Sequence, residues 1–270
     1  MTYYAGLDVS LKEVSICVVD AEGLAQLART GWYTPVHVRS EEADRLRTLL
    51  GARERLIKLR VEIEAHVRGV LKTFGIRLGG VTYARNRQSF RDDLAAACQG
   101  GWALSILADG FIAVHETVCR ATVELSRDLR AIAQENPVSR RLMTIPGVGP
   151  IVSLNFVTLA DDPARFRRVA DVGAFLGLTP RRYQSGDTDY SGRISKCGDA
   201  VMRGVLIEAA GCVIGKMKRF SRLRSWAIGL AARKGGKKAM IGTARKLAVL
   251  MLAFWKNGTD CQWAKEEATA

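Results

Sequence analysis

The chain has 270 residues, of which 48% are hydrophobic and 25% charged, a composition typical of a folded protein and not of a disordered one. Its formal charge is +14, and seventeen basic against four acidic residues between Arg181 and Lys256 give that segment +13. Such clustering indicates a polyanion-binding protein, and it favours nucleic acid over a merely solvated basic surface. No apolar run reaches the roughly 18 residues of a membrane span, and the N-terminus lacks a signal-peptide pattern. We therefore expect a cytoplasmic protein without a membrane partner.

The first forty residues combine strand and helix patterns. Residues 3–9 and 14–19 are rich in β-branched and aromatic side chains, which predicts a two-stranded hairpin. Apolar residues at helical spacing predict a helix over 21–29. Asp8 then falls at the end of the first strand, where it could bind Mg²⁺ or simply cap a turn. Asp20 falls where the second strand meets the helix without a visible turn.

Two long helices are predicted in the middle of the chain. Ser40 is a suitable N-cap for a helix that runs to about Phe74 with a nearly continuous apolar stripe. A second helical pattern over residues 106–135 could fold back as its antiparallel mate and form a coiled-coil arm. Residues 77–101 between the two helices give no clear pattern.

After Asn136 the pattern changes to shorter helices broken by glycine and proline. In the sequence IPGVGP, Gly147 and Gly149 could present backbone N–H groups to a phosphate, or they could form an ordinary helix–helix turn. A turn-rich basic loop is predicted over residues 180–198. The last helices are expected at about Val201–Gly215, Phe220–Lys234 and Ala239–Trp255. We predict domains at residues 1–38, 39–136 and 137–258, with a tail at 259–270.

Ser185 is the most suggestive side chain of the basic loop. A serine hydroxyl can attack a phosphodiester when neighbouring cations stabilise the transition state. The candidate cations are Arg181, Arg182, Arg193 and Lys196. The spacing alone also fits a loop that only contacts phosphate, and Ser191 and Ser195 are lesser candidates of the same type. The three histidines, His37, His66 and His115, match no metal or triad spacing and are interpreted as structural or solvent-facing.

Several motifs, taken in order, resemble the insertion-sequence transposases of the one-ten and eleven-eleven type, relatives of the Piv invertase. The matching stretches are GLDVS, DAEGLAQLARTGWY, TIPGVGP, FLGLTPRRYQSG, GRISKCGDAVMR and ARKLAVLM. The resemblance is densest from Leu142 to about Trp255. It implies a RuvC-like, ribonuclease-H-like N-terminal domain with four metal-binding acids and a C-terminal domain with a nucleophilic serine. It places the first acid on Asp8, the last on Asp20 and the serine on Ser185.

The same resemblance implies the cofactor and the partners. Asp8 and Asp20 would bind Mg²⁺ or Mn²⁺, the substrate would be DNA, and a guide RNA would direct the enzyme. A homo-oligomer would form, and the helical arm is the element through which we expect it. Here the segment that carries the second and third acids of the family is absent, so that the second strand runs directly into the last helix at Asp20. This indicates an internal deletion.

The fold class expected from these features is mainly α with a small N-terminal β element. It comprises a truncated RuvC-like domain, a long antiparallel helical arm and a helical C-terminal transposase domain. The leading hypothesis is a DNA transposase or recombinase that cleaves and exchanges strands through Ser185, with help from the acidic metal site. The alternatives are a catalytically defective DNA-binding remnant that inhibits or pairs with full-length transposase, and a basic RNA-associated scaffold.

Overall fold

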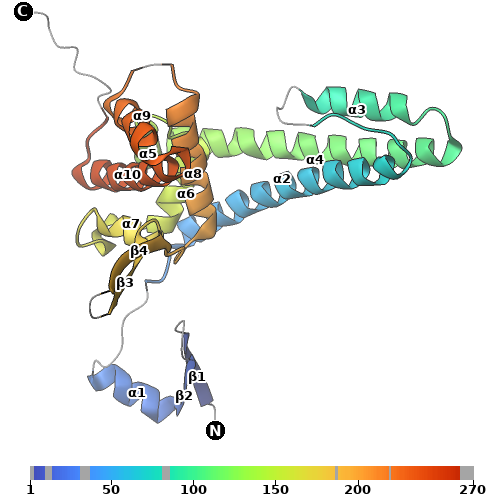
Figure 1. Ribbon diagram of the computed structural model, residues 1–270. Coiled ribbons are helices and arrows are strands. Elements are labelled where there is room, and N and C mark those ends of the chain that lie inside the picture. The colour runs from blue at the N-terminus through green and yellow to red at the C-terminus, as the bar shows by residue number, and fades with distance from the viewer. Residues whose placement is uncertain are drawn as a thin grey trace, which may run out of the picture. The chain divides into compact units, whose positions relative to one another are not determined.

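The structure is a computed structural model, and it describes residues 3–9, 14–30, 37–80, 86–185, 188–218 and 220–261. The chain forms two compact units, Met1–Arg39 and Ser40–Ala270. Each is described by itself below. The described residues are mostly helical, as predicted, and they include two small antiparallel hairpins (Figure 1).

The first unit consists of one hairpin and one helix. Strand β1 (Tyr3–Val9) pairs antiparallel with β2 (Val14–Asp20), and helix α1 (Ala21–Thr30) follows β2 without an intervening residue. The predicted hairpin, the predicted helix and the direct junction between strand and helix at Asp20 are therefore confirmed. The RuvC-like character of this unit stays a prediction.

In the second unit, two long helices lie side by side as an arm (Figure 1). Helix α2 (Glu41–Thr73) has 33 residues, which gives it a length of about 50 Å. The Ser40 side chain caps it by accepting a hydrogen bond from the Ala43 N–H at 3.2 Å, as expected. Helix α4 (Trp102–Glu135) begins one turn before the predicted start.

Contacts along the arm show that α2 and α4 are antiparallel. Near one end Arg53 donates a hydrogen bond to Ser126, and eleven residues further along α2 Glu64 contacts His115, eleven residues earlier in α4. Residue numbers that rise in one helix while they fall in the other define an antiparallel pair. The arm is thus the pair that the sequence predicts, whereas supercoiling and self-association through it stay predictions.

A further helix, α3 (Asn86–Ala97), covers the outer part of the arm and was not predicted. Its Phe90 and Leu94 are buried and belong to the same apolar cluster as Leu71 and Ala108 of the long helices. These two apolar residues sit four apart, on one helical face, and they are too few to produce a clear period in the sequence. The sequence of residues 77–101 therefore gave no prediction for this stretch, and the structure supplies the helix.

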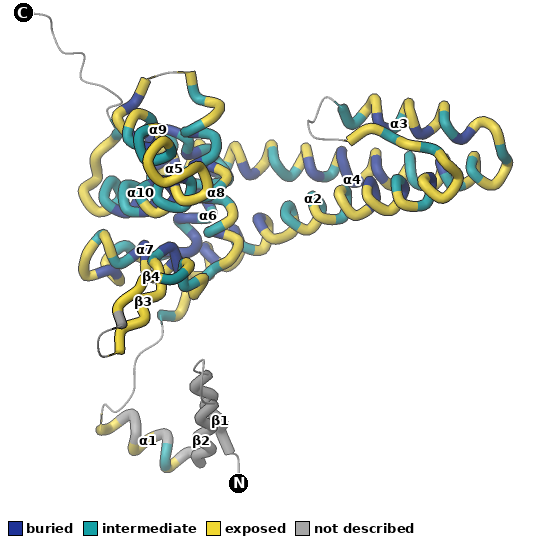
Figure 2. Tube along the Cα trace, viewed as in Figure 1, coloured by how far each residue is buried: buried dark blue, intermediate teal, exposed yellow. Residues whose placement is uncertain are grey.

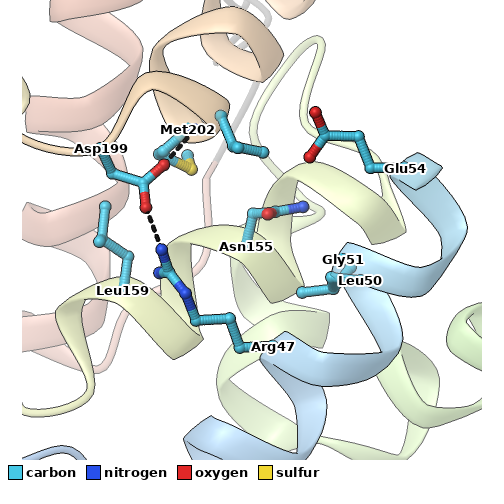
Figure 3. A pocket seen from close by; sticks show the side chains of 9 residues that line it. Arg47, Leu50, Gly51, Glu54, Asn155, Leu159, Asp199 and Met202 are labelled. Carbon is cyan, nitrogen blue, oxygen red and sulfur yellow. Dashed lines mark hydrogen bonds and ion pairs between the residues drawn. The ribbon is translucent and has the colours of Figure 1, made fainter. Parts of the chain in front are cut away.

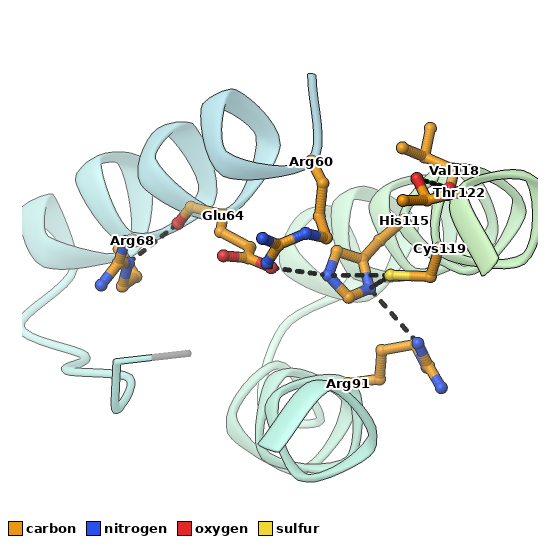
Figure 4. Close-up of polar contacts among 8 residues, drawn as sticks. All are labelled: Arg60, Glu64, Arg68, Arg91, His115, Val118, Cys119 and Thr122. Atoms are coloured by element: carbon orange, nitrogen blue, oxygen red, sulfur yellow. Dashed lines mark hydrogen bonds and ion pairs between the residues drawn. The ribbon is translucent and has the colours of Figure 1, made fainter. Parts of the chain in front are cut away.

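The arm encloses a buried polar cluster centred on His115 (Figure 4). Glu64 accepts hydrogen bonds from Arg60 at 2.6 Å and from His115 Nε2 at 3.0 Å, and Arg91 contacts His115 Nδ1 at 3.3 Å. Burial lowers the pKa of His115, the Glu64 carboxylate opposes this shift, and the charge of Arg91 adds to it. A neutral imidazole that donates from Nε2 and accepts at Nδ1 satisfies all these contacts. Of the two readings left open for His115, the structural one is confirmed.

The rest of the second unit is a helical body with one main apolar core (Figure 2). Its described elements are α5 (Pro137–Leu142), α6 (Pro150–Ala160), η1 (Pro163–Arg165), α7 (Asp171–Phe175), β3 (Pro180–Ser185), β4 (Thr188–Ile194), α8 (Ala200–Gly215), α9 (Arg222–Lys234) and α10 (Gly236–Asn257). Helix α10 packs against α8, α9 and α7, and its Leu247 and Met251 are fully buried. The three predicted C-terminal helices are confirmed to within a few residues.

The base of the arm is joined to this body through α6. Leu154 of α6 lies in one buried cluster with Leu46 and Leu50 of α2 and with Leu129 of α4. In addition, Asp161 at the end of α6 accepts hydrogen bonds from the Ser40 backbone N–H at 2.8 Å and from its hydroxyl at 2.6 Å. The predicted boundary between residues 136 and 137 therefore lies inside one compact unit.

By length and composition alone, α4 could cross a membrane. It contains an 18-residue window with a mean hydropathy of 1.3, of which 22% is buried in the structure. The helix is not an uninterrupted apolar run, since it carries Asp109 and Glu116, and it therefore does not contradict the prediction that no such run reaches about 18 residues. A core helix of a soluble protein passes the same test, and α4 packs along α2 and carries the buried His115 and Thr122. The absence of a membrane partner stays a prediction.

Candidate functional site

The predicted turn-rich loop over residues 180–198 is a β-hairpin. Strands β3 and β4 pair antiparallel, and Ser185 lies opposite Thr188 at the tip, beyond which residues 186 and 187 are not described. Every residue of β3 is exposed, and Figure 2 shows the hairpin projecting from the helical body in the exposed colour. The structure therefore presents the candidate nucleophile, Ser185, on the surface of the second unit.

An arginine of α8 binds both ends of the hairpin at its base, where the backbone N–H groups of Ser195 and Lys196 also donate to the carbonyl oxygens of Thr179 and Gly177. Arg203 Nη1 of α8 donates to three carbonyl oxygens, those of Leu176 at 3.2 Å, Cys197 at 2.6 Å and Gly198 at 3.1 Å. Leu176 lies at the end of α7, before β3, whereas Cys197 and Gly198 lie between β4 and α8. The guanidinium therefore binds the chain on both sides of the hairpin. Its position is thereby fixed although its own surface is exposed.

An ion pair links the residue after the hairpin base to the arm (Figure 3). Asp199 caps α8 by accepting from the Met202 N–H at 2.8 Å, and its other oxygen accepts from Arg47 of α2. Burial raises the pKa of Asp199, but the bonds from Met202 and Arg47 outweigh this effect and hold the pKa below its usual range. A pocket of about 240 Å³ lies beside this pair, between α2, α6 and the start of α8.

The four predicted phosphate-binding cations all lie on or beside the hairpin, and all are exposed. Arg182 is engaged by Asp189, to which it donates two hydrogen bonds at 2.9 and 2.7 Å. This pairing raises the pKa of Arg182 and lowers that of Asp189. Arg181 donates to the Ser195 carbonyl oxygen at 3.1 Å. Within the described part of the chain, Arg181, Arg193 and Lys196 form no ion pair, which leaves their charges available to a ligand.

Two tyrosines on the hairpin were missed by the sequence reasoning. Tyr183 and Tyr190 lie opposite one another, and their rings are stacked with centroids 4.8 Å apart and planes 17° from parallel. The signal was present in YQSGDTDY, where the two tyrosines stand at equal distances from the central Gly-Asp pair. Recognising it requires knowing that the segment is a hairpin.

The two glycines of IPGVGP lie in the turn between α5 and α6. Gly147 has a positive φ of 85°, and a Cβ there would lie 2.4 Å from Val213 Cγ2 and 3.2 Å from the Ala209 carbonyl oxygen. Gly149 is the N-cap of α6. The helix–helix turn is therefore what the structure shows, packed against α8. Phosphate binding by either glycine stays a prediction.

The candidate metal ligands belong to the first unit. The ladder pairs Asp8 with Ser15 and Asp20 with Tyr3, so that the two aspartates lie five positions apart. At the usual rise per residue this is about 17 Å. One ion holds its oxygen ligands at about 2.0–2.6 Å, so two short aspartate side chains do not reach it together across that interval. The side chains are not among those that the structure describes, and a Mg²⁺ or Mn²⁺ site stays a prediction.

The segment that carries the hairpin is similar to known proteins. Residues 139–225 match the sequence model of the transposase IS116/IS110/IS902 family. The chain is 29% identical over 247 residues to the transposase for insertion sequence element IS1111A of Coxiella burnetii, which covers 87% of this chain and 65% of that protein. It is 27% identical over 256 residues to the putative transposase y4pF/y4sB of Sinorhizobium fredii, covering 92% of this chain and 64% of that one.

A third relative is the probable family 20 transposase of Pseudomonas aeruginosa, 28% identical over 246 residues, which cover 89% of this chain and 72% of the relative. The chain thus spans about 64–65% of the length of the first two relatives. Residues 139–225, which are similar to that family of transposases, contain the hairpin, the whole of α8 and the start of α9.

Proposed function

We propose that the chain acts on DNA as the transposase of an insertion sequence, with Ser185 as its nucleophile. The match of residues 139–225 to the transposase IS116/IS110/IS902 family supports this proposal. One observation carries the proposal: Ser185 lies at the exposed tip of a hairpin that is anchored at its base and carries cations that form no ion pair among the described residues. A nucleophile on a projecting hairpin can reach a phosphate of a duplex, whose backbone is too wide to enter the small pockets of the body.

The chemistry is a phosphoryl transfer to a serine. The bond between Ser185 Oγ and phosphorus forms as one backbone P–O bond breaks, the serine loses its proton, and the departing strand end gains one. The phosphoserine link conserves the energy of the broken ester for rejoining to another strand. Cations near the phosphate stabilise the charge that develops on its oxygens. Arg181, Arg193 and Lys196 are the side chains that we propose for this role.

The cofactor and the other partners predicted from the resemblance stay part of the proposal. A divalent ion, when bound, would stabilise the charge on the attacked phosphate. The described ladder does not favour one ion held by both Asp8 and Asp20, so no step above depends on it. A guide RNA is compatible with the positive charge of residues 181–256, and a homo-oligomer with the exposed face of the long arm.

The test is the trapping of a covalent protein–DNA adduct. The protein is incubated with end-labelled DNA that carries the element's ends, in the presence of Mg²⁺, and adducts are separated on a denaturing gel. We expect Ser185→Ala to abolish the adduct and Ser191→Ala, an exposed serine on the opposite strand of the same hairpin, to retain it. An adduct that survives Ser185→Ala would overturn the assignment of the nucleophile.

A second candidate function is a DNA-binding remnant that pairs with, or inhibits, full-length transposase. The observation that favours it is the direct passage from β2 into α1 at Asp20, because no residue is left there to carry two further acids. Both candidates predict salt-sensitive DNA binding. DNA binding by the wild-type chain with no adduct, together with reduced adduct formation when it is mixed with full-length transposase, would support the remnant.

A further inference from the structure

The stacked tyrosines of the hairpin remain partly uncovered. Tyr183 is 44% exposed and Tyr190 is 55% exposed, although aromatic pairs of this kind usually serve to bury apolar surface. A cross-strand aromatic pair stabilises a hairpin by only about 0.2–1 kcal/mol. Roughly half of each tyrosine is therefore accessible to a ligand.

The pair shares a face of the hairpin with Ser185. Tyr183 and Ser185 lie two residues apart in β3, and alternate residues of a strand point to the same side. Tyr190 lies directly opposite Tyr183 and therefore belongs to that face too. The Arg182–Asp189 ion pair lies on the other face, because Arg182 and Asp189 are the sequence neighbours of Tyr183 and Tyr190. The nucleophile and the aromatic surface are thus neighbours on one surface.

Gly192 leaves room for the Tyr183 ring on that face. A Cβ at position 192 would stand 2.8 Å from Tyr183 Cε2, which is closer than such contacts occur. Any larger residue there would push the ring aside and disturb its stacking on Tyr190. The sequence therefore combines a glycine with two tyrosines, and the missing side chain at Gly192 leaves room for the stacked rings.

The cations near the two tyrosines indicate the chemical class of the ligand. Arg181, Arg193 and Lys196, the exposed cations that form no ion pair among the described residues, lie on or just after the two strands that carry the tyrosines. Aromatic rings flanked by cations are the combination with which proteins hold single-stranded nucleic acid, since bases stack on the rings and phosphates meet the cations. An acidic peptide would use the cations but would leave the stacked rings without a partner.

We propose that Tyr183 and Tyr190 form a stacking platform for an unpaired base of the DNA strand beside the phosphate that Ser185 attacks. The position of that base rests on the proposed function, whereas base stacking itself does not require Ser185 to react. The platform holds the strand after the duplex opens at the cleavage point, so that the phosphate stays within reach of the serine hydroxyl.

The experiment measures binding of the full chain to a single-stranded DNA of about 12 nucleotides, in the size range that such proteins cover. The oligonucleotide carries one 2-aminopurine, whose fluorescence falls when it stacks on an aromatic ring. We expect Tyr190→Thr, which keeps a strand-forming residue but removes the ring, to weaken binding by about 5- to 150-fold and to abolish the quenching. Tyr190→Phe keeps the ring, and it should bind within about twofold of wild type.

Two controls separate stacking from loss of the hairpin and from the serine chemistry. If Tyr190→Thr only removes a ring, the salt dependence of its remaining binding matches wild type, whereas Arg193→Gln lowers the slope by about one. Ser185→Ala should retain full quenching while it loses the covalent adduct. A failed adduct test with intact quenching therefore overturns the nucleophile and leaves the platform standing.

The proposal is overturned if Tyr190→Thr binds and quenches like wild type. It is also overturned if the loss of binding in this variant is accompanied by a changed salt slope, since the hairpin itself would then have collapsed. Tyrosine-dependent quenching with the matching RNA oligonucleotide, and none with DNA, would assign the platform to RNA and overturn the DNA-strand proposal.

Discussion

Replacing Glu64 by leucine should strongly destabilise the arm. The Glu64 side chain is 3% exposed, and one of its oxygens accepts hydrogen bonds from both Arg60 and His115. Leucine removes that acceptor, and it leaves the Arg60 charge, which is 12% exposed, without its partner in the interior. The His115 Nε2–H also loses its acceptor. Removing one partner of a buried ion pair costs about 3–5 kcal/mol.

Two further variants divide this cost into its parts. Glu64→Gln keeps an oxygen that can accept both hydrogen bonds but removes the charge, so we expect a loss of about 1–3 kcal/mol. Glu62→Gln is the matched control on the same helix, because Glu62 is 57% exposed and meets Arg55 at 3.3 Å on the surface. A surface pair of this kind contributes at most about 0.5 kcal/mol in most cases.

The assay is thermal unfolding followed by circular dichroism at the helical band. For a unit of this size, 1 kcal/mol corresponds to about 2–4 °C, so Glu64→Leu should lower the midpoint by about 6–20 °C. Joint replacement of Arg60, Glu64 and His115 by methionine, leucine and phenylalanine should recover much of this loss, because no buried charge is then left unpaired. A Glu64→Leu midpoint equal to that of Glu62→Gln would refute the reasoning.

Two further predictions concern His115 and the turn before α6. Burial lowers the pKa of His115 in the folded chain, so the unfolded chain binds this proton at a higher pH than the folded chain does. The free energy of unfolding is therefore highest above the ordinary histidine pKa of about 6.5, and it falls as the pH drops below that value. His115→Gln should flatten unfolding midpoints measured between about pH 5 and 8, and an unchanged slope would contradict this account. Gly147→Ala should lower the free energy of unfolding, measured in urea, by roughly 2–5 kcal/mol, because of the positive φ and the clash with Val213. Gly149→Ala should lower it by at most about 1 kcal/mol, because a Cβ there meets nothing within 4 Å. Equal costs would show that the backbone at Gly147 is not the constraint.

The elements that the sequence predicted are those with a long or regular pattern. The apolar stripe of α2 repeats over 33 residues, and the Ser40 cap marks its start, so both the helix and its first turn were predictable. Helix α3 has only two buried apolar residues, and its position depends on the apolar residues of α2 and α4 with which they cluster. Short elements that gain their stability from tertiary contacts leave little trace in the sequence.

The hairpin of the candidate site was hidden for a different reason. Its residues are almost all exposed, so no alternation of buried and exposed side chains marks its strands. It is fixed instead by the Arg203 contacts at its base, which join carbonyl groups that lie 21 residues apart in the chain. Ser185 and its cations could be proposed from composition and resemblance, but the shared face of Ser185, Tyr183 and Tyr190 depends on a register that only the structure gives.

The two candidate functions separate along the two units of the chain. The hairpin with Ser185, its anchoring arginine and its cations all lie in Ser40–Ala270, and none of the contacts described for them involves Met1–Arg39. The carboxylates Asp8 and Asp20 lie in Met1–Arg39, on a ladder that holds them far apart. We therefore expect DNA binding and base stacking to depend on the second unit. The covalent step is the one that would need both units, so adduct formation, and not affinity for DNA, would distinguish a working transposase from a remnant.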